Sequence, residues 1–307
     1  MMGKKSISIV APAYNHEKYI EKCLWSVANQ GIQHKELIII DDVSKDSTPL
    51  IIKDIIKDSL FTSKFDLGVK FIEHEQNKGA FYSLNEGLKL AQGDFLTMIN
   101  TDDYYDERRL ELLLKECEAY GSEFAFGGVI VVDQNGNRVN SGYGKELMKY
   151  QDLIDKCPRV SMALTRGNGT ISTGNMVFTK SLYEKLGGFG NYKYVHDWDF
   201  ALRASLITEP VFVKNAIYYY RVHVGNTIAE ISNNKSHPDT LEKPENGKTI
   251  GINPLVKHFV SILKNEYVNK MIPTECVWEY FVNHKKYYYD DDGIVWAWNE
   301  AKKIKEQ

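Results

Sequence analysis

The segment SISIVAPAYN at residues 6–15 decides the fold. Its first six residues form a short apolar run with β-branched side chains, which indicates a buried strand. A helix is expected at residues 17–30, where apolar side chains recur on one face and Asn15 or His16 can act as the N-cap. A buried strand that passes through a polar turn into a helix predicts the first unit of an α/β fold.

The same unit recurs along the chain. Strands are expected at residues 37–40, 69–73, 95–99, 123–132 and 211–220, and helices from Thr48-Pro49 and at 80–92, 107–120 and 197–206. Gly93 and Gly121 stand where a glycine can end the helix before it. This alternation predicts an α/β, Rossmann-like fold with a mostly parallel sheet flanked by helices.

The composition limits the class of protein. The chain has 307 residues, 43% of them hydrophobic, which is enough for a sizeable core. A formal net charge of −3 argues against a broad nucleic-acid-binding face. There is no run of about 18 apolar residues, and residues 1–7 lack the apolar stretch of a signal peptide. Four scattered cysteines indicate reduced thiols, so we expect a cytoplasmic protein.

Polar residues follow three of the expected strands. They occupy residues 12–15, 41–42 and 100–103. In open parallel sheets, ligands bind outside the carboxyl ends of the strands. The sequence therefore predicts a ligand site where these three segments converge.

Five ordered segments resemble the family 2 glycosyltransferases with the GT-A fold. They are SIVAPAYNHEKYIEKCLWSVANQ from residue 8, ELIIIDDVSKDST from residue 36, NKGAFYSLNEG from residue 77, INTDDYYDERRL from residue 99, and GGF…HDWDFALR from residue 187 followed by YRVHVGNT from residue 220. The resemblance covers about residues 6–226. It implies a GT-A-type fold, a nucleotide-diphosphate sugar as donor, Mn²⁺ or Mg²⁺ as cofactor, and inversion at the anomeric carbon.

The resemblance places the donor at the first strand ends. Tyr14 can stack on a base and Asp42 can accept from a ring N–H, and both match uracil-contacting positions of the family, which favours a UDP-sugar. Without that context, Tyr14 is a loop aromatic over the core edge, and Asp41-Asp42 are strand-end caps. The implied donor-binding residues are Pro12, Ala13, Tyr14, Asn15, Glu17, Asp42, Asn77, Gly79, Asn85, Thr101 and Asp102.

A metal site is expected after the strand at 95–99. Asp102 and Asp103 offer hard oxygen ligands for Mg²⁺ or Mn²⁺, and His223 matches a segment that supplies a metal-binding histidine in the family. Asn100 stands where many relatives carry the first Asp of the motif, which removes one negative charge. The alternatives are that the Asp pair only caps a helix and that His223 is structural or solvated.

The acceptor side is expected near the segment HDWDFALR. Asp197 matches the family's catalytic base, and a place at a helix start would favour its ionised form through the helix dipole. The alternatives are a plain N-cap role for Asp197 and a base at Asp199. The implied acceptor-binding residues are Gly174, Asn175, His196 and Trp198.

Two departures from the family pattern keep a second function open. Leu84 stands where many relatives carry an Arg, with Arg166 as a possible substitute phosphate contact, and Asn100 reduces the metal motif. A nucleotide-sugar-binding protein with impaired transfer is therefore the alternative. A nucleotidyltransferase is disfavoured, because the first strand is not followed by a Gly-rich phosphate loop.

The expected organisation has three parts. Residues 1–228 form the catalytic domain, with a donor half at about 1–105 and an acceptor half at about 106–228. A polar linker or loop follows at 229–250, and an aromatic, helical extension at 251–307 either covers the catalytic domain or contacts a membrane surface. The expected acceptor is a glycan or glycolipid of a surface polysaccharide, met at the inner face of the membrane.

Overall fold

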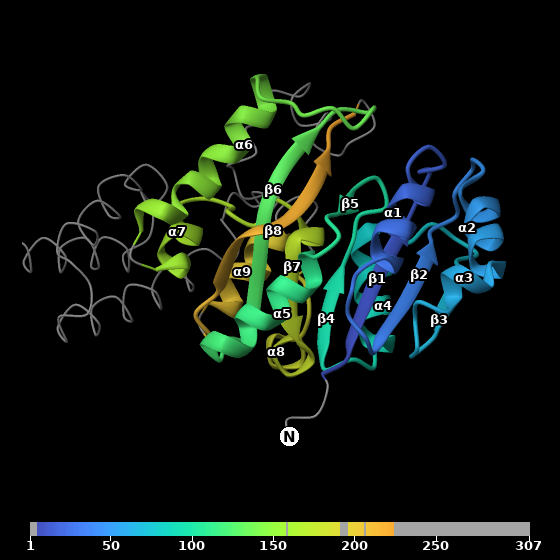
Figure 1. Ribbon diagram of the computed structural model, residues 1–307, viewed down its shortest axis with the longest axis horizontal. Coiled ribbons are helices and arrows are strands. Elements are labelled where there is room, and N and C mark those ends of the chain that lie inside the picture. The colour runs from blue at the N-terminus through green and yellow to red at the C-terminus, as the bar shows by residue number, and fades with distance from the viewer. Residues whose placement is uncertain (1–4, 158, 191–195, 206, 224–307) are drawn as a thin grey trace, which may run out of the picture.

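A computed structural model of the chain describes residues 5–157, 159–190, 196–205 and 207–223. Its centre is one mixed sheet with the strand order β3-β2-β1-β4-β7-β6-β8-β5. Figure 1 shows this sheet with β3 at the right. The strands are β1 (Ile7–Ala13), β2 (Lys35–Asp41), β3 (Val69–Glu73), β4 (Phe95–Met98), β5 (Tyr104–Tyr105), β6 (Phe124–Val132), β7 (Met176–Thr179) and β8 (Val211–Arg221).

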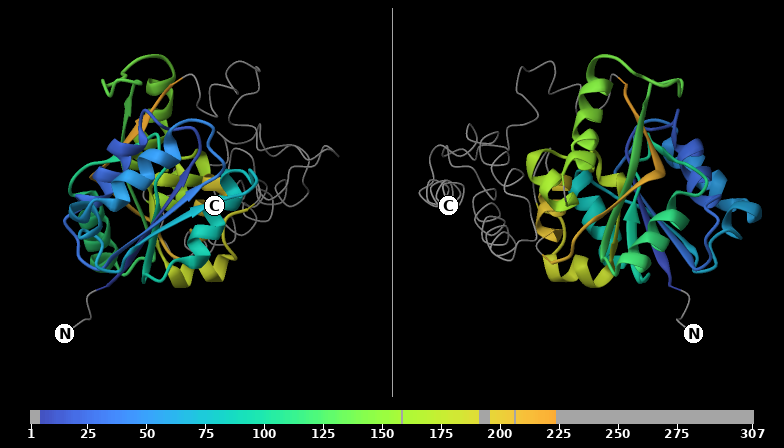
Figure 2. Two further views of the ribbon diagram at one scale, coloured as in Figure 1. Left: turned by 90° about the vertical axis from the view of Figure 1, so that its right-hand side faces the viewer. Right: turned by 60° about the vertical axis from the view of Figure 1, so that its left-hand side comes forward.

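Helices cover both faces of the sheet (Figure 2). One face packs against α1, α2, α3 and α5, and the other against α4, α7, α8 and α9. The helices are α1 (Ile20–Ala28), α2 (Thr48–Lys57), α3 (Ser59–Thr62), α4 (Ala80–Leu90), α5 (Arg109–Tyr120), α6 (Gly142–Asp152), α7 (Val160–Arg166), α8 (Lys180–Leu186) and α9 (His196–Ala204), with short 3₁₀ turns η1 (Ile154–Lys156) and η2 (Thr173–Asn175).

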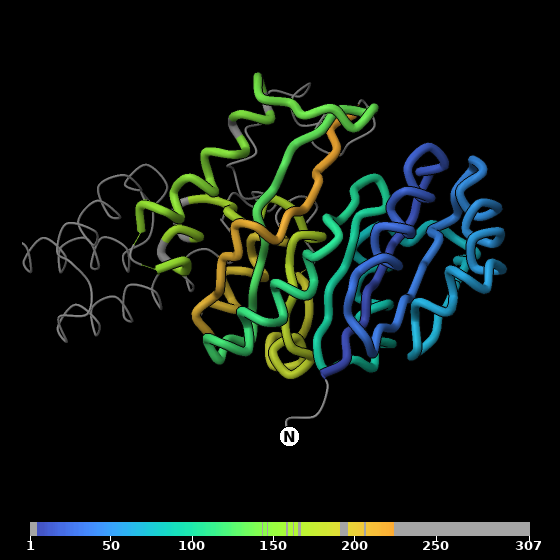
Figure 3. Tube along the Cα trace, viewed as in Figure 1, coloured from blue at the N-terminus to red at the C-terminus, as the bar shows by residue number. Residues whose placement is uncertain are grey.

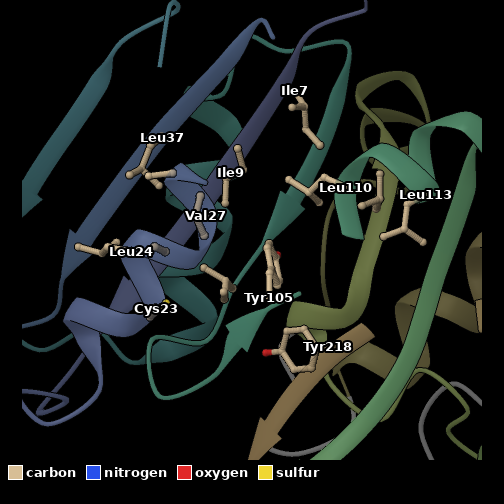
Figure 4. Packing of buried hydrophobic residues seen from close by; sticks show 14 of the residues in the cluster. Ile7, Ile9, Cys23, Leu24, Val27, Leu37, Tyr105, Leu110, Leu113 and Tyr218 are labelled. Atoms are coloured by element: carbon tan, nitrogen blue, oxygen red, sulfur yellow. The ribbon is translucent and has the colours of Figure 1, made fainter. Parts of the chain in front are cut away.

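The central strands are buried on both sides. In β1, Ile7 and Ile9 point into the core under α1, while Val10 points into the core on the opposite face. Figure 4 shows Leu24 and Val27 of α1 packed over these strands. An apolar run without polar alternation is typical of a strand covered on both faces, so the predicted buried strands and the α/β class are confirmed.

The sheet is parallel only in part. β3, β2, β1 and β4 run parallel, as predicted, and β6 runs parallel to β8. β7 is antiparallel to both β4 and β6, and β5 is antiparallel to β8. The trace in Figure 3 shows β8 beside β6, although the two strands are far apart in the sequence. The second half of the chain thus extends the sheet by non-local pairing.

Several helix ends differ from the sequence prediction. α1 begins at Ile20 with Tyr19 as its N-cap, so neither Asn15 nor His16 caps it. Asn15 instead adopts a left-handed conformation with φ of 56°. Gly121 ends α5 with φ of 62°, as predicted. Gly93 is not a helix end, since α4 stops at Leu90.

The predicted linker at 229–250 and helical extension at 251–307 lie outside the described residues, as does the end of the catalytic domain from residue 224. Within the described residues, no helix is both long and apolar enough to cross a membrane.

Gly93 permits a close approach between the start of β4 and β1. A Cβ at this position would lie 2.6 Å from the backbone N of Ser8, whereas a Cβ at Gly31 would have no neighbour within 4 Å. We expect Gly93→Ala to lower the free energy of unfolding by about 1–3 kcal/mol, because the backbone of β1 must move. The matched control Gly31→Ala should change it by less than about 0.5 kcal/mol. Urea unfolding measures both, and equal effects would contradict the assignment.

Candidate active site

The carboxyl ends of β1, β2 and β4 bring three polar loops together. These strands are parallel neighbours in the sheet, so their ends lie on one edge. The Thr101 hydroxyl donates to the Pro12 carbonyl at 3.0 Å, and the Asp42 backbone N–H donates to the Ala13 carbonyl at 2.9 Å. The predicted convergence of these segments is confirmed.

The first loop is held against the second by hydrogen bonds between its side chains and backbone N–H groups. Asn15 Oδ1 accepts from the Lys45 N–H at 2.7 Å, and Glu17 Oε2 accepts from the Ser47 N–H at 3.0 Å. Asn15 and Glu17, expected to bind the donor, therefore use these oxygens to fix the loop. Tyr14, which precedes them, remains 42% exposed, so its ring is accessible for stacking.

Asp42 organises the segment that leads into α4. Its carboxylate accepts from the backbone N–H groups of Lys78 and Gly79 at 2.8 and 2.7 Å, and lies 2.7 Å from His74 Nδ1. Asn77 Nδ2 donates to the Asp42 carbonyl at 2.9 Å. The expected donor residues Asp42, Asn77 and Gly79 thus form one connected unit, which His74 completes.

A carboxylate and two imidazoles meet at the centre of the site. One ligand atom each from His16, Asp102 and His223 lies within 4.8 Å of the others, and Asp102 Oδ2 is 3.1 Å from His223 Nε2. Burial raises the pKa of Asp102, but the hydrogen bond with His223 and the charges of both histidines outweigh it and bring the pKa below its usual value. An ionised carboxylate with imidazole nitrogens fits a divalent transition ion such as Mn²⁺.

Asp103 does not join this group, which corrects its prediction as a metal ligand. It is 1% exposed. Its oxygens accept from the Tyr218 hydroxyl at 2.5 Å and from the Arg221 N–H at 2.6 Å. Burial, followed by the charge of Asp102, raises its pKa well above the usual value. Asp103 therefore joins the β4 loop to β8.

Arg221 reinforces the same junction. Its Nε donates to the Asp102 carbonyl at 2.7 Å, and its Nη1 donates to the Asp133 carbonyl at 3.1 Å. The guanidinium lies 4.6 Å from the centre of the Tyr19 ring and 5.4 Å from that of Tyr104. Arg221 thereby fixes the backbone that carries both Asp102 and His223.

The expected base, Asp197, lies in the first turn of α9 and is 6% exposed. Asn168 Nδ2 donates to its Oδ2 at 2.9 Å, and the Trp198 N–H donates to its Oδ1 at 2.8 Å. Burial raises its pKa above the usual value, and the charge of His196 and these hydrogen bonds oppose the shift only in part. Burial therefore opposes the ionised form that was expected from the helix start. A raised pKa is what a general base needs, because it brings the pKa nearer to the working pH.

Two of the expected acceptor residues support the fold instead. Asn175 is fully buried, with its amide bonded to Gly127, Thr170 and Arg109. A Cβ at Gly174 would lie 2.2 Å from the Tyr218 hydroxyl, so this glycine permits close packing. Both residues are internal, which corrects their placement on an acceptor surface.

The remaining predicted residues lie around Asp197 and α4. His196 Nε2 is 3.0 Å from the Thr173 hydroxyl, and Trp198 Nε1 donates to the Leu164 carbonyl at 2.7 Å. Asn85 Oδ1 accepts from the Tyr183 hydroxyl and from the Phe189 N–H, both at 3.1 Å, and so ties α4 to the GGF segment.

Sequence reasoning missed several residues that shape the site. They are His16, His74, Asn168 and Arg221. His16 stands inside the segment YNHE, and Arg221 precedes the matched histidine by two positions, so both lay within recognised motifs. Their roles depend on side-chain direction, which the motifs do not give.

The model of the family described as "Glycosyl transferase family 2" matches residues 8–187. The chain belongs to this family. It is 26% identical over 232 residues to the putative glycosyltransferase EpsH of Bacillus subtilis, covering 74% of this chain and 64% of that protein. It is 30% identical over 152 residues to the putative teichuronic acid biosynthesis glycosyltransferase TuaG of the same organism, covering 49% and 58%. The match thus spans less than two thirds of either relative.

Solved structures show the same fold. Residues 1–349 of S. aureus TarS, in complex with UDP-GlcNAc, superpose with a TM-score of 0.61 at 20% identity, covering 96% of this chain and 79% of that chain. The mannosyltransferase PcManGT from Pyrobaculum calidifontis, in complex with GDP-Man and Mn²⁺, gives a TM-score of 0.59 at 15% identity, covering 99% and 74%. The chain therefore has the expected GT-A fold.

The two neighbouring carboxylates should respond differently to amide substitution. Asp102→Asn should weaken Mn²⁺ binding by about 10-fold or more, because it removes the charged ligand. Asp103→Asn should leave the Mn²⁺ affinity close to that of the parent. It should lower the midpoint of thermal unfolding, because an amide N–H would face the donors on Tyr218 and Arg221. Calorimetric titration with Mn²⁺ and thermal unfolding check both variants. Equal loss of Mn²⁺ affinity would return Asp103 to the ligand set.

Proposed function

We propose that this glycosyltransferase moves a sugar, with inversion, from a UDP-sugar to a hydroxyl of a glycan or glycolipid acceptor. The observation that carries the proposal is the group of His16, Asp102 and His223 at the carboxyl ends of the parallel strands. It lies beside loops that offer an exposed ring at Tyr14 and the Asp42 unit for a nucleotide. Such an edge is where α/β sheets bind their ligands.

The donor proposal rests on Tyr14, Asp42 and the residues connected to them. Tyr14 would stack on the base, and Asp42, held by His74 and the N–H groups of 78–79, would accept from the base edge. UDP-GlcNAc is the ligand named for TarS and GDP-Man the one named for PcManGT. The preference for uridine therefore rests on the motif match at Tyr14 and Asp42.

Transfer would proceed by a single displacement. Asp197 takes the proton of the acceptor hydroxyl while the hydroxyl oxygen bonds to the anomeric carbon. The bond from that carbon to the diphosphate oxygen breaks, and its electron pair leaves with the nucleoside diphosphate. A divalent ion held by Asp102 and the histidines would neutralise charge on this leaving group. Asn168 keeps the Asp197 carboxylate oriented by its hydrogen bond of 2.9 Å.

The acceptor proposal follows from the relatives. The name of TuaG gives teichuronic acid biosynthesis as its process, and we extend a surface-polysaccharide role to this chain. Action in the cytoplasm, at the inner face of the membrane when the acceptor carries a lipid, is part of the proposal. The aromatic residues expected to form a membrane contact or cover lie outside the described residues.

The two departures that keep the binding-protein alternative open both have a place in the packing of the protein. Asn100 Nδ2 donates to the Ser172 hydroxyl at 3.0 Å and to Asp103 Oδ2 at 3.3 Å, where a second carboxylate would repel Asp103. Leu84 is 4% exposed and packs in the core under α4. Both departures thus have a packing reason. The side chain of Arg166, the expected substitute phosphate contact, lies outside the described residues.

The test of the proposed function compares two carboxylates on α9. Asp197→Asn should lower transfer by about 10²–10⁴-fold, because the amide cannot take a proton, with nucleotide affinity unchanged. Asp199→Asn should cost far less, since Asp199 forms an ion pair with Arg203 at 2.7 Å. Parent turnover should fall as the pH drops through the raised pKa of Asp197. Parent-like turnover of Asp197→Asn would remove the base assignment, and loss of donor affinity would make Asp197 a structural residue.

Nucleotide preference and metal dependence can be tested together. We expect UDP to bind more tightly than GDP, because Tyr14 and Asp42 match uracil-contacting positions, and we expect Mn²⁺ to strengthen both. Turnover of a UDP-sugar should stop in chelator and return when Mn²⁺ is restored. A calorimetric screen of both nucleotides with and without Mn²⁺ measures the preference. Tighter binding of GDP would reverse the donor proposal, and full activity in chelator would remove the metal.

A further inference from the structure

We propose that His16 is a third protein ligand of the divalent ion, and that this enzyme binds Mn²⁺ before any nucleotide arrives. The inference rests on the proposed metal-assisted transfer. It adds to the Asp102 and His223 pair a ligand that the family resemblance did not supply.

The three side chains come from separate segments of the chain. His16 follows β1, Asp102 follows β4 and His223 follows β8. Their ligand atoms lie within 4.8 Å of one another. Two ligands on one ion with bonds of about 2.1–2.2 Å are at most about 4.4 Å apart. Small side-chain rotations therefore suffice for all three to reach one ion.

The hydrogen bonds around Thr101 fix the tautomer of His16. The Thr101 hydroxyl has one proton, which it donates to the Pro12 carbonyl at 3.0 Å. The same oxygen lies 2.7 Å from His16 Nδ1 and must accept there, so Nδ1 carries the imidazole proton. Nε2 then keeps its lone pair, which is the form that coordinates a metal. A bond to one ring nitrogen that prepares the other is the usual outer-shell arrangement of metal-binding histidines.

The backbone of His16 is also fixed. Its N–H donates to the Thr48 hydroxyl at 2.8 Å, and Thr48 is fully buried. On the preceding residue, Asn15 Oδ1 accepts from Lys45 at 2.7 Å. The imidazole therefore sits on a loop that the protein's own hydrogen bonds hold at several points, and none of these bonds involves a nucleotide.

The ligand set also predicts which ion is preferred. Asn100 replaces a carboxylate of the usual motif and is turned towards Ser172 and Asp103. Two imidazoles and one carboxylate make a nitrogen-rich site, which favours Mn²⁺ over Mg²⁺, an ion that prefers oxygen ligands. His16 is thus a residue that determines metal specificity.

The test uses Mn²⁺ alone on the nucleotide-free full chain. His16→Asn keeps an amide N–H near the position of Nδ1 but removes the Nε2 ligand. The matched control is His34→Asn, because His34 also occupies a loop and bonds through Nδ1, to Asp66 at 2.9 Å. We expect the His16 variant to bind Mn²⁺ at least about 10-fold more weakly. Its Mn²⁺-over-Mg²⁺ preference should fall, and the His34 variant should match the parent.

Two further measurements keep the result unambiguous. Thermal unfolding in chelator shows whether each variant is folded, and pulsed electron paramagnetic resonance of Mn²⁺ on the parent counts the bound imidazole nitrogens, with two expected. One nitrogen in the parent, or parent-like Mn²⁺ affinity and preference in a folded His16 variant, would overturn the inference. Absence of Mn²⁺ binding to the nucleotide-free parent would do the same. Failure of UDP-sugar transfer in the parent would instead refute the proposed function, since it leaves the Mn²⁺ titrations unaffected.

Discussion

The site depends on the hydrogen bonds that the buried carboxylate of Asp103 accepts. This carboxylate joins the loop after β4 to the C-terminal end of strand β8, because it accepts hydrogen bonds from the Tyr218 hydroxyl and the Arg221 N–H. Asp102 and His223 stand directly beside these two anchors, so their separation of 3.1 Å follows from the junction. Figure 4 shows Tyr218 beside Tyr105 in the core below it. The bond from Arg221 Nε to the Asp102 carbonyl, at 2.7 Å, adds to this connection where the ligands meet.

Burying a carboxylate opposes its ionisation, and the structure surrounds Asp103 with compensating groups. Asn100 contributes an N–H donor to Asp103. The guanidinium of Arg109, which is itself fully buried, lies 4.5 Å from the centre of the Tyr105 ring and 5.5 Å from that of Tyr218. Burial lowers the pKa of Arg109. Aromatic faces attract a desolvated guanidinium, so the two tyrosines stabilise the buried cation, and the Tyr218 hydroxyl also donates to Asp103.

The donor side is built on a different principle. Loops after β1 and β2 exchange hydrogen bonds between side chains and backbone, as Asn15 does with Lys45 and Glu17 with Ser47. Such bonds fix loop conformation without a hydrophobic core beneath it. The result is a rigid edge from which Tyr14 projects into solvent while His16 turns inwards. Polar motif residues such as Asn15 and Glu17 therefore bond to protein atoms, because they support the loops.

The sequence by itself determined the alternation of strands and helices, the convergence of three strand ends and the family, because periodicity and ordered motifs are local properties. It also placed Asp102, His223 and Asp197 in the candidate site. Only the tertiary structure decided that His16 turns towards Asp102, whereas Asp103 turns towards Tyr218 and Arg221. It also decided that Asn175 is internal and that β8 lies beside β6. The physical reason is that the direction of a loop side chain is set by its hydrogen-bond partners. Here those partners come from segments tens of residues away, and no local pattern records them.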